Sequence, residues 1–339
     1  MKTTVITLAY NHERFIRESL GSVLEQTWPA DEIIVIDDSS SDGTVSEIEK
    51  FLSEHPGAPV RFVRNERNLG VSGCFAKAIS MAGGDILFMM AGDDVSVTGR
   101  IGRCVAYFEE HPGAMAVIAN AEIIDAGSRP CGKLDNCVGK TEPVALTLSD
   151  LPAGAYFLRG RSSCGAASAY RAEVFRSFAP LRSGLYAEDD PAAFRAMLLG
   201  TCDFLPETLI RWRRHEHNLS HGNFVRRGPE MSVHFRRCEA MVDQMLADAA
   251  EWKIRQRERP GAGFDHAVSA FCFHKAKWAL WAAAHESGLS LRAFCSAAQG
   301  MSACRPSLEA LLKEAWRPTC RILIPFPLQR LMANARARR

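Results

Sequence analysis

The feature that most constrains this chain is the regular alternation of strand-like and helix-like segments in its first ninety residues. Short apolar runs rich in β-branched residues alternate with longer runs whose apolar residues recur at helical spacing. The strand-like runs are Thr3 to Leu8, Glu32 to Asp37, Val60 to Val63 and Asp85 to Met90, and the helix-like runs include Arg14 to Gln26 and Cys74 to Met81. Because this order is typical of parallel strands joined by helices, we expect a mostly parallel α/β fold.

Beyond residue 94 the alternation becomes less regular. We expect a helix over residues 100–110, a strand near 116–118, a long loop or hairpin over 125–145 and a helix from about Pro191. The segment "DFLPETLIRWRRH" predicts a short strand pair. From about Phe224 onward the patterns are helical only, so we predict one domain over residues 1–222 and a helical extension over 223–339.

Composition excludes several classes of protein. A formal net charge of +2 leaves no basic excess for binding nucleic acid. No uncharged apolar run approaches the roughly 20 residues of a membrane-spanning helix, and the N-terminus lacks the pattern of a secretion signal. The 11 cysteines include no CxxC pair. This pattern predicts reduced thiols in the cytoplasm rather than disulfides or a zinc cluster.

Two pairs of aspartates stand directly after predicted strands. Asp37 and Asp38 end the second strand, and Asp93 and Asp94 follow the fourth within "ILFMMAGDDV". The carboxyl ends of parallel strands share one edge of the sheet, where open α/β sheets bind ligands. A divalent cation would let adjacent carboxylates share this edge, and oxygen ligands favour Mg²⁺ or Mn²⁺. The alternative is a solvated turn near a helix start.

Four segments, in this order, resemble those of family 2 glycosyltransferases, which have the GT-A fold. They are "TVITLAYNHERFIRESLGSVLEQTWPADEIIVIDDSSSDGT", "RNERNLGVSGCFAKAISMAGGDILFMMAGDD", "AEDDPAAFRAMLLG" and "RWRRHEHNLS". The resemblance extends over most of residues 1–221, and its first segment is long and free of gaps. It implies a GT-A domain with a nucleotide-sugar site on the carboxyl edge of the sheet.

Three parts of the resemblance match the donor nucleotide site. In the run Ala9 to Asn11, Tyr10 matches the aromatic residue beside the nucleobase, and Asp38 matches the acid that hydrogen-bonds the base. An acid suits uracil because it can accept a hydrogen bond from a ring N–H. Asn68 and Gly70 match the family's "N-x-G" loop near the donor. Taken alone, Tyr10 could instead cover the core, and the other residues could serve turns and helix caps.

The resemblance also implies a metal site. Asp93 and Asp94 match the last two positions of the family's "DxDD"-like motif. This match places Asp94 on a Mg²⁺ or Mn²⁺ ion that bridges the donor diphosphate, and Asp93 near the ribose or the same ion. Ala91 stands where many members have the first aspartate, which weakens the assignment of ligands but does not remove the site.

An inverting transferase makes one displacement and needs a carboxylate that takes the proton of the acceptor hydroxyl. Glu188 and Asp189 match the acids of the family's "ED…R…G" segment, with Arg195 and Gly200 in register. We predict Asp189 as the general base and Glu188 as a supporting group that orients the acceptor. Asp190 stands where an aromatic residue is frequent. Three acids before a proline also favour a helix N-terminus, and both interpretations can hold together.

The segment "RWRRHEHNLS" matches the part of the family that closes over the donor phosphates. Arg213, Arg214 and His215 are therefore predicted to contact the diphosphate, and His217 could approach the metal. The alternative is an edge strand with a solvated basic face. Thr208 stands where processive synthases have glutamine, which favours a non-processive enzyme.

The last 25 residues are basic and apolar. After Glu314 there are no acids, and six arginines are interleaved with "ILIPFPL". Such a segment could make a peripheral contact with the inner face of a membrane, which would suit a lipid-linked acceptor. The alternative is a helix packed on the core with a frayed basic end.

These observations predict a cytoplasmic, metal-dependent, inverting glycosyltransferase of polysaccharide or cell-envelope synthesis. It would move one sugar from a nucleoside diphosphate donor, expected to be a UDP-sugar, to a hydroxyl of a glycan or lipid-linked glycan. A nucleotidyltransferase or a redox enzyme is disfavoured because "AYNHERF" after the first strand contains no glycine. The alternative is a catalytically inactive relative that binds a nucleotide sugar or acts as a scaffold, which Ala91 favours.

Overall fold

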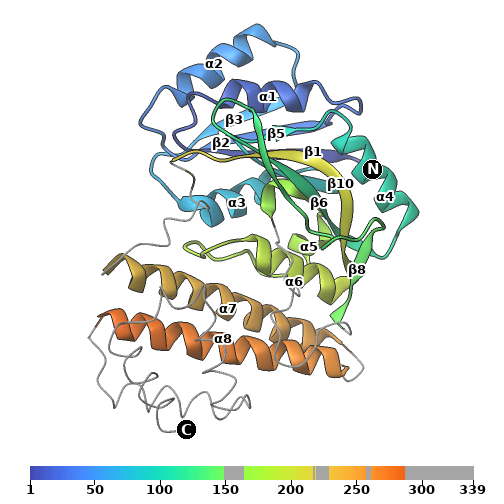
Figure 1. Ribbon diagram of the computed structural model, residues 1–339, viewed down its shortest axis with the longest axis vertical. Coiled ribbons are helices and arrows are strands. Elements are labelled where there is room, and N and C mark those ends of the chain that lie inside the picture. Colours follow the sequence, from blue (N-terminus) through green and yellow to red (C-terminus); the bar gives the residue numbers. More distant parts are fainter. Residues whose placement is uncertain (149–163, 217, 219–228, 257–260, 287–339) are drawn as a thin grey trace. The chain divides into compact units, whose positions relative to one another are not determined.

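The computed structural model describes residues 1–148, 164–216, 218, 229–256 and 261–286. These residues belong to two compact units. The first unit carries a ten-stranded sheet with its helices, and the second contains two long helices, α7 and α8 (Figure 1).

The first four strands form the parallel part of the sheet and pair in the order β3-β2-β1-β4. Their bounds are β1 (Thr3–Ala9), β2 (Glu32–Asp37), β3 (Val60–Arg64) and β4 (Ile86–Ala91). The connecting helices are α1 (Ile16–Leu24), α2 (Thr44–Glu54) and α3 (Gly70–Met81). The predicted alternation and the α/β fold class are therefore confirmed.

Apolar side chains explain why these strands lie at the centre of the sheet. Ile33 to Ile36 are at most 1% exposed, so both faces of β2 are covered, as is usual for parallel strands. Helix α1 contributes Ile16, Leu20 and Val23, which share one helical face and pack in the same core cluster.

The register of the parallel strands sets the position of the two acid pairs. Ala9 lies opposite Asp37, and Leu8 lies opposite Ala91. Both acid pairs therefore leave the sheet at the carboxyl end of a parallel strand, and they face the same edge, as the sequence predicts.

The rest of the sheet is mixed. Its strands are β5 (Val95–Ser96), β6 (Ala114–Ile124), β7 (Pro130–Leu134), β8 (Val144–Leu146), β9 (Ser168–Arg171) and β10 (Thr201–Arg213). Its helices are α4 (Arg100–Glu110), the short 3₁₀ turn η2 (Gly165–Ala167), α5 (Glu173–Arg176) and α6 (Asp189–Leu199). Strand β9 is antiparallel to β4 and to β6, and β7 pairs with β6 as a hairpin.

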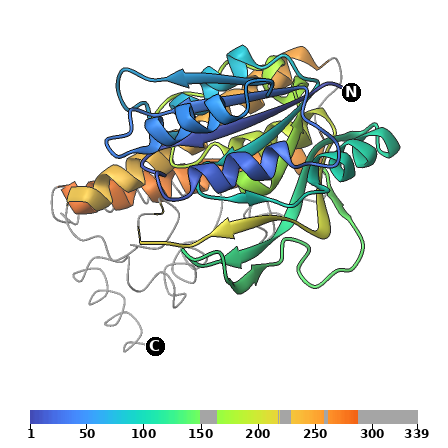
Figure 2. The same ribbon diagram turned by 90° about the horizontal axis from the view of Figure 1, so that it is seen from above.

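The prediction of a short strand pair over residues 203–215 is wrong, because β10 is one long strand. It runs parallel to β6, and Figures 1 and 2 both show the two strands side by side. Pro206 lies within a register shift between Leu205 and Thr208, where a bulge lets the ladder continue past a residue without an N–H. The side chain of Asn120 donates to the Pro206 carbonyl at 2.9 Å.

The second unit contains α7 (Pro229–Arg255) and α8 (Ala262–Glu286). Phe235 stacks on Trp278 and Trp252 stacks on Phe264, so the helices pack antiparallel. The predicted domain boundary at 222/223 and the basic tail lie outside the described residues. No helix in the described part of the chain is long and apolar enough to cross a membrane.

Candidate functional site

The end of β2 anchors a loop through Asp38, whose carboxylate is 5% exposed. Its Oδ1 accepts hydrogen bonds from the Asn65 side chain (2.9 Å) and the Leu69 N–H (2.7 Å), and its Oδ2 accepts the Gly70 N–H (2.8 Å). The Asn68 side chain donates to the Asp38 carbonyl at 3.3 Å. The structure therefore brings together the predicted residues Asp38, Asn68 and Gly70.

The run that follows β1 lies beside this loop. The Ala9 carbonyl accepts the Asp38 N–H at 2.9 Å, which places the backbone of Tyr10, the next residue, close to Asp38. The Tyr10 side chain is exposed, which leaves its ring available to a planar ligand. Asn11 has a φ of 56°, and its Oδ1 accepts the Ser41 N–H at 2.9 Å. The three residues of "AYN" thus join the loops after β1 and β2.

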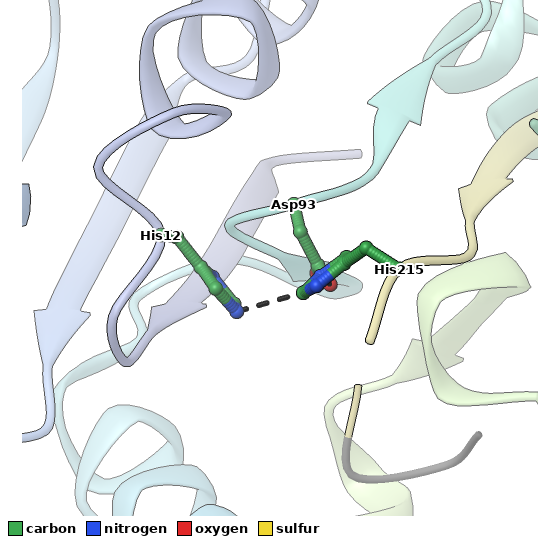
Figure 3. A group of neighbouring side chains, drawn as sticks. All are labelled: His12, Asp93 and His215. Carbon is green, nitrogen blue, oxygen red and sulfur yellow. Dashed lines mark hydrogen bonds and ion pairs between the residues drawn. The ribbon is translucent and has the colours of Figure 1, made fainter. Parts of the chain in front are cut away.

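Two histidines and an aspartate form a cluster at the end of β4 (Figure 3). Asp93 Oδ2 lies 3.0 Å from His215 Nε2 and 3.8 Å from His12 Nε2, and it accepts a hydrogen bond from the Asn218 side chain (2.9 Å). One ligand atom from each of His12, Asp93 and His215 lies within 4.8 Å of the others. Among the described residues, this is the group of histidine and carboxylate side chains that could share a metal ion.

Electrostatics favour the metal-binding forms of these groups. Burial opposes the ionisation of Asp93, but the hydrogen bond with His215 and the charges of His12 and His215 outweigh it and lower the pKa of Asp93. Burial also lowers the pKa of His12, against the opposing effect of Asp93. An ionised aspartate and a neutral imidazole are the forms that bind metals. The sequence analysis predicts Asp93 and His215 at this site but misses His12. The feature that could have indicated His12 is its position directly after the "AYN" run.

Asp94 is almost fully buried, and its Oδ1 accepts the Arg213 N–H at 2.8 Å. Burial and the charge of Asp93 raise the pKa of Asp94 well above its usual value. A divalent cation beside the pair would offset this repulsion, so the residues present fit the predicted ion. The role of Asp94 as a ligand stays a prediction, because the three-residue cluster contains Asp93 instead.

Arg213 is buried and braces the turn that carries the two aspartates. Its Nε donates to the Asp93 carbonyl (2.7 Å), its Nη1 to the Ser128 hydroxyl (2.9 Å), and its Nη2 pairs with Glu18 (2.6 Å). The guanidinium also lies 4.8 Å from the centre of the Phe15 ring. Strand β10 pairs with β6 along its end and with β5 at Ile210 and Arg211, and the buried side chain of Arg213 does not lie on a solvated face.

The neighbouring predicted residues differ from Arg213. Arg214 is exposed, with its guanidinium 5.0 Å from the centre of the Trp212 ring. Its contact with a diphosphate stays a prediction. His217 lies outside the described residues.

Helix α6 starts with the predicted acids, which are half-buried. Asp189 Oδ2 accepts the Gly165 N–H at 3.0 Å, and a Cβ at position 165 would collide with Asp189 Oδ1. Burial and the charge of Glu188 raise the pKa of Asp189 well above its usual value. Burial raises the pKa of Glu188 as well, and it raises the pKa of Asp190 to about 7. These acids are therefore proton acceptors of unusual strength for carboxylates.

The predicted base lies beside the 3₁₀ turn η2, which contacts β4. Burial, followed by the charges of Asp189 and Asp94, raises the pKa of the Cys164 thiol to about 12. Cys164 stands directly before this turn. Arg195 is fully buried and donates to the Ala179 carbonyl at 2.8 Å, and Gly200 ends α6.

Comparison with known proteins identifies relatives of this chain. Residues 4–176 match the family model described as Glycosyl transferase family 2. EpsE of Bacillus subtilis is 34% identical over 110 residues, which are 32% of this chain and 39% of EpsE. An uncharacterized glycosyltransferase of Haemophilus influenzae is 28% identical over 224 residues, which are 64% of this chain and 67% of that protein. The chain thus spans from about two fifths to two thirds of the length of these two relatives.

Solved structures with the same fold include one with a bound nucleotide sugar. The crystal structure of S. aureus TarS 1-349 in complex with UDP-GlcNAc matches with a TM-score of 0.59 and 17% sequence identity. The match covers 99% of this chain and 88% of that chain. At this identity the similarity establishes the fold, and the predicted GT-A fold class is confirmed.

Proposed function

Because this chain belongs to glycosyl transferase family 2, we propose that it moves a single sugar from a UDP-sugar to a hydroxyl of a glycan or lipid-linked glycan, with inversion at the anomeric carbon. The observation that carries the proposal is that the unit with the sheet contains three groups of suitable chemistry. These groups are the carboxylate of Asp38, the cluster of His12, Asp93 and His215, and the carboxylate of Asp189. They suit a nucleobase, a diphosphate with its cation, and an acceptor hydroxyl, respectively.

The surroundings of Asp38 support uracil as the base. A carboxylate offers about four acceptor positions, and three of those of Asp38 are used by protein donors. The Cys74 thiol hydrogen-bonds to Asp38 as well, and the uracil of a nucleotide has a single ring N–H, for which a carboxylate oxygen is an acceptor. The exposed ring of Tyr10 would stack on the base. TarS, which has the same fold, was solved with UDP-GlcNAc.

We propose that Asp93, His215 and, as the sequence predicts, Asp94 would hold a Mg²⁺ or Mn²⁺ ion. Such an ion neutralises the charge that develops on the departing diphosphate. Arg214 is the exposed arginine that would contact the phosphates. Arg213 acts by keeping the turn of Asp93 and Asp94 in place, because its guanidinium is used for internal contacts.

Asp189 is the proposed general base. The acceptor oxygen bonds to the anomeric carbon as the bond to the diphosphate oxygen breaks, and Asp189 takes the hydroxyl proton. Its raised pKa makes Asp189 a stronger base than an ordinary aspartate, and the Gly165 N–H fixes the direction of its carboxylate. Glu188 contributes through its negative charge and by orienting the acceptor.

The second candidate is an inactive relative that binds a nucleotide sugar or acts as a scaffold. Ala91 favours it, because this residue ends β4 where many members of the family have an acid. The alternative keeps the donor site and lacks turnover. Both candidates suit the cytoplasm, since the buried Cys74, Cys104 and Cys202 are free thiols.

Thermal unfolding with a panel of nucleotides tests the donor site. UDP, GDP, CDP and TDP would each be added with Mn²⁺ or with EDTA. A ligand that binds only the folded state raises the midpoint, so we expect UDP with Mn²⁺ to raise it most, and EDTA to abolish the shift. We expect Asp94→Ala to lose the shift as well. The absence of a shift with all four nucleotides would refute the donor site.

A further inference from the structure

His12 belongs to no part of the predicted site, yet it is held there from several sides. Its N–H donates to the Thr44 hydroxyl at 2.8 Å, and its carbonyl accepts the N–H groups of Phe15 and Ile16 at 2.9 Å. Its ring packs against the backbone at Gly92, where a Cβ would lie 2.8 Å from Nδ1. The backbone and ring of His12 are therefore fixed by β4 and by the starts of two helices.

The ring of His12 has unused binding capacity. Its Nδ1 is buried without a hydrogen-bond partner among the described residues, and its Nε2 faces Asp93 at 3.8 Å, too far for a hydrogen bond. Asp93 Oδ2 is already 3.0 Å from His215 Nε2 and accepts the amide of Asn218. A simple ion pair with Asp93 therefore explains the placement of His12 poorly.

We propose that His12 is a second imidazole ligand of the catalytic cation and makes the site select Mn²⁺ or another nitrogen-binding first-row ion over Mg²⁺. The inference rests on the proposed function, because the ion is the one that holds the donor diphosphate. It adds a second histidine, His12, to the proposed ligands Asp93 and His215.

The distances fit shared coordination. Ligand atoms about 2.1 Å from one ion lie roughly 3 to 4 Å from each other. Asp93 Oδ2 is 3.0 Å and 3.8 Å from the Nε2 atoms of His215 and His12, and one ligand atom of each residue lies within 4.8 Å of the others. Figure 3 shows the three side chains converging on one point from separate loops.

The chemistry of the ligands determines which ion is preferred. Mg²⁺ is bound by oxygen and gives up its water reluctantly, whereas Mn²⁺ and the later first-row ions accept imidazole nitrogen more readily. Each added imidazole therefore favours Mn²⁺ over Mg²⁺. Loss of His12 should lower the affinity for Mn²⁺ more than the affinity for Mg²⁺.

Electron paramagnetic resonance with Mn²⁺ alone tests the inference on the full chain. Free Mn²⁺ is counted in a titration, Mg²⁺ is added as a competitor, and pulsed spectra detect nitrogen coupled to the bound ion. The variants are His12→Gln, His12→Asn and His215→Gln. His55→Gln is the matched control, since His55 is exposed and stacks on Phe51 away from the cluster. Circular dichroism verifies that each variant is folded.

We expect two coupled imidazole nitrogens in the wild type and in the control, and one in each single variant. We expect His12→Gln to weaken Mn²⁺ binding by about tenfold or more, and to reduce the preference for Mn²⁺ over Mg²⁺. The inference is overturned if wild type binds no Mn²⁺, or if both variants of His12 keep the wild-type spectrum and affinity.

The two proposals can fail separately. If the nitrogen signals follow the expectation while UDP-sugars are not turned over, the proposed function fails and the inference about His12 stands. If UDP-sugars are turned over while both His12 variants bind Mn²⁺ like wild type, the inference fails and the proposed function stands.

Discussion

At the scale of single residues, neighbouring acids have different tasks. Asp37 is fully buried, and its Oδ1 accepts the Ser40 N–H at 3.0 Å, so it holds the loop after β2. Asp38 accepts hydrogen bonds from Asn65, Leu69 and Gly70 and so holds the loop after β3. In the second pair, Asp93 joins two histidines, and Asp94 is held by Arg213. The identity of each acid is visible in the sequence, but its task depends on contacts far away in the chain.

Gly165→Ala tests whether the direction of the Asp189 carboxylate matters. The added Cβ would collide with Oδ1, so the carboxylate must move. We expect turnover to fall by about 100-fold while UDP binding changes little, because a misplacement near 1 Å can have this effect. Gly57→Ala is the control, since its Cβ would meet nothing within 4 Å. Equal turnover in wild type and Gly165→Ala would contradict the account.

The pH dependence of turnover tests the surroundings of the base. The raised pKa of Asp189 means that the base becomes protonated, and turnover is lost, as pH falls through a value above that of an ordinary aspartate. Burial keeps the pKa raised in Glu188→Gln, but the charge of Glu188 is gone. We therefore expect the acid limb of the pH–turnover profile to lie at lower pH in Glu188→Gln than in wild type. An unchanged or higher acid limb, measured as turnover against pH, would refute this coupling.

At the scale of secondary-structure elements, the central feature is the connection that Arg213 makes between segments distant in sequence. It joins the end of β10 to Glu18 on α1, to the turn after β4 and to Ser128 in the β6–β7 hairpin. Periodicity predicted α1, β4 and the region of the hairpin, because these depend on local patterns. It failed at β10, where the ladder with β6 continues past Pro206 as one long strand.

Arg213→Lys tests this connection. Lysine keeps the charge but cannot supply the planar fork of donors, so buried acceptors lose their partners. We expect the free energy of unfolding to fall by about 1–3 kcal/mol, measured by urea denaturation. Arg129→Lys is the control, because the Arg129 side chain is 82% exposed. Indistinguishable unfolding curves for Arg213→Lys and wild type would show that the fork is not needed.

At the scale of the whole molecule, the proposed site residues are more than 200 positions apart in the sequence but belong to the unit that contains the sheet. The sequence predicted the fold class and the edge of the sheet to which both acid pairs lead, since strand order and parallel pairing follow from the alternation. It could not predict that His12 joins Asp93 and His215, because that contact depends on how the loop after β1 folds back onto Gly92. It also could not show that Arg213 faces inward, because an alternating strand pattern does not say what covers each face.

The most direct test of the central claim is a paired measurement on Asp189→Asn. UDP binding in the presence of Mn²⁺ is measured by calorimetry, and release of UDP from a UDP-sugar is measured on the same preparations, with Asp190→Asn as the matched control. We predict that Asp189→Asn binds UDP like wild type and loses at least about 100-fold in turnover, whereas Asp190→Asn keeps most of its activity. Unchanged turnover in Asp189→Asn, or a larger loss in Asp190→Asn, would contradict the assignment of the base.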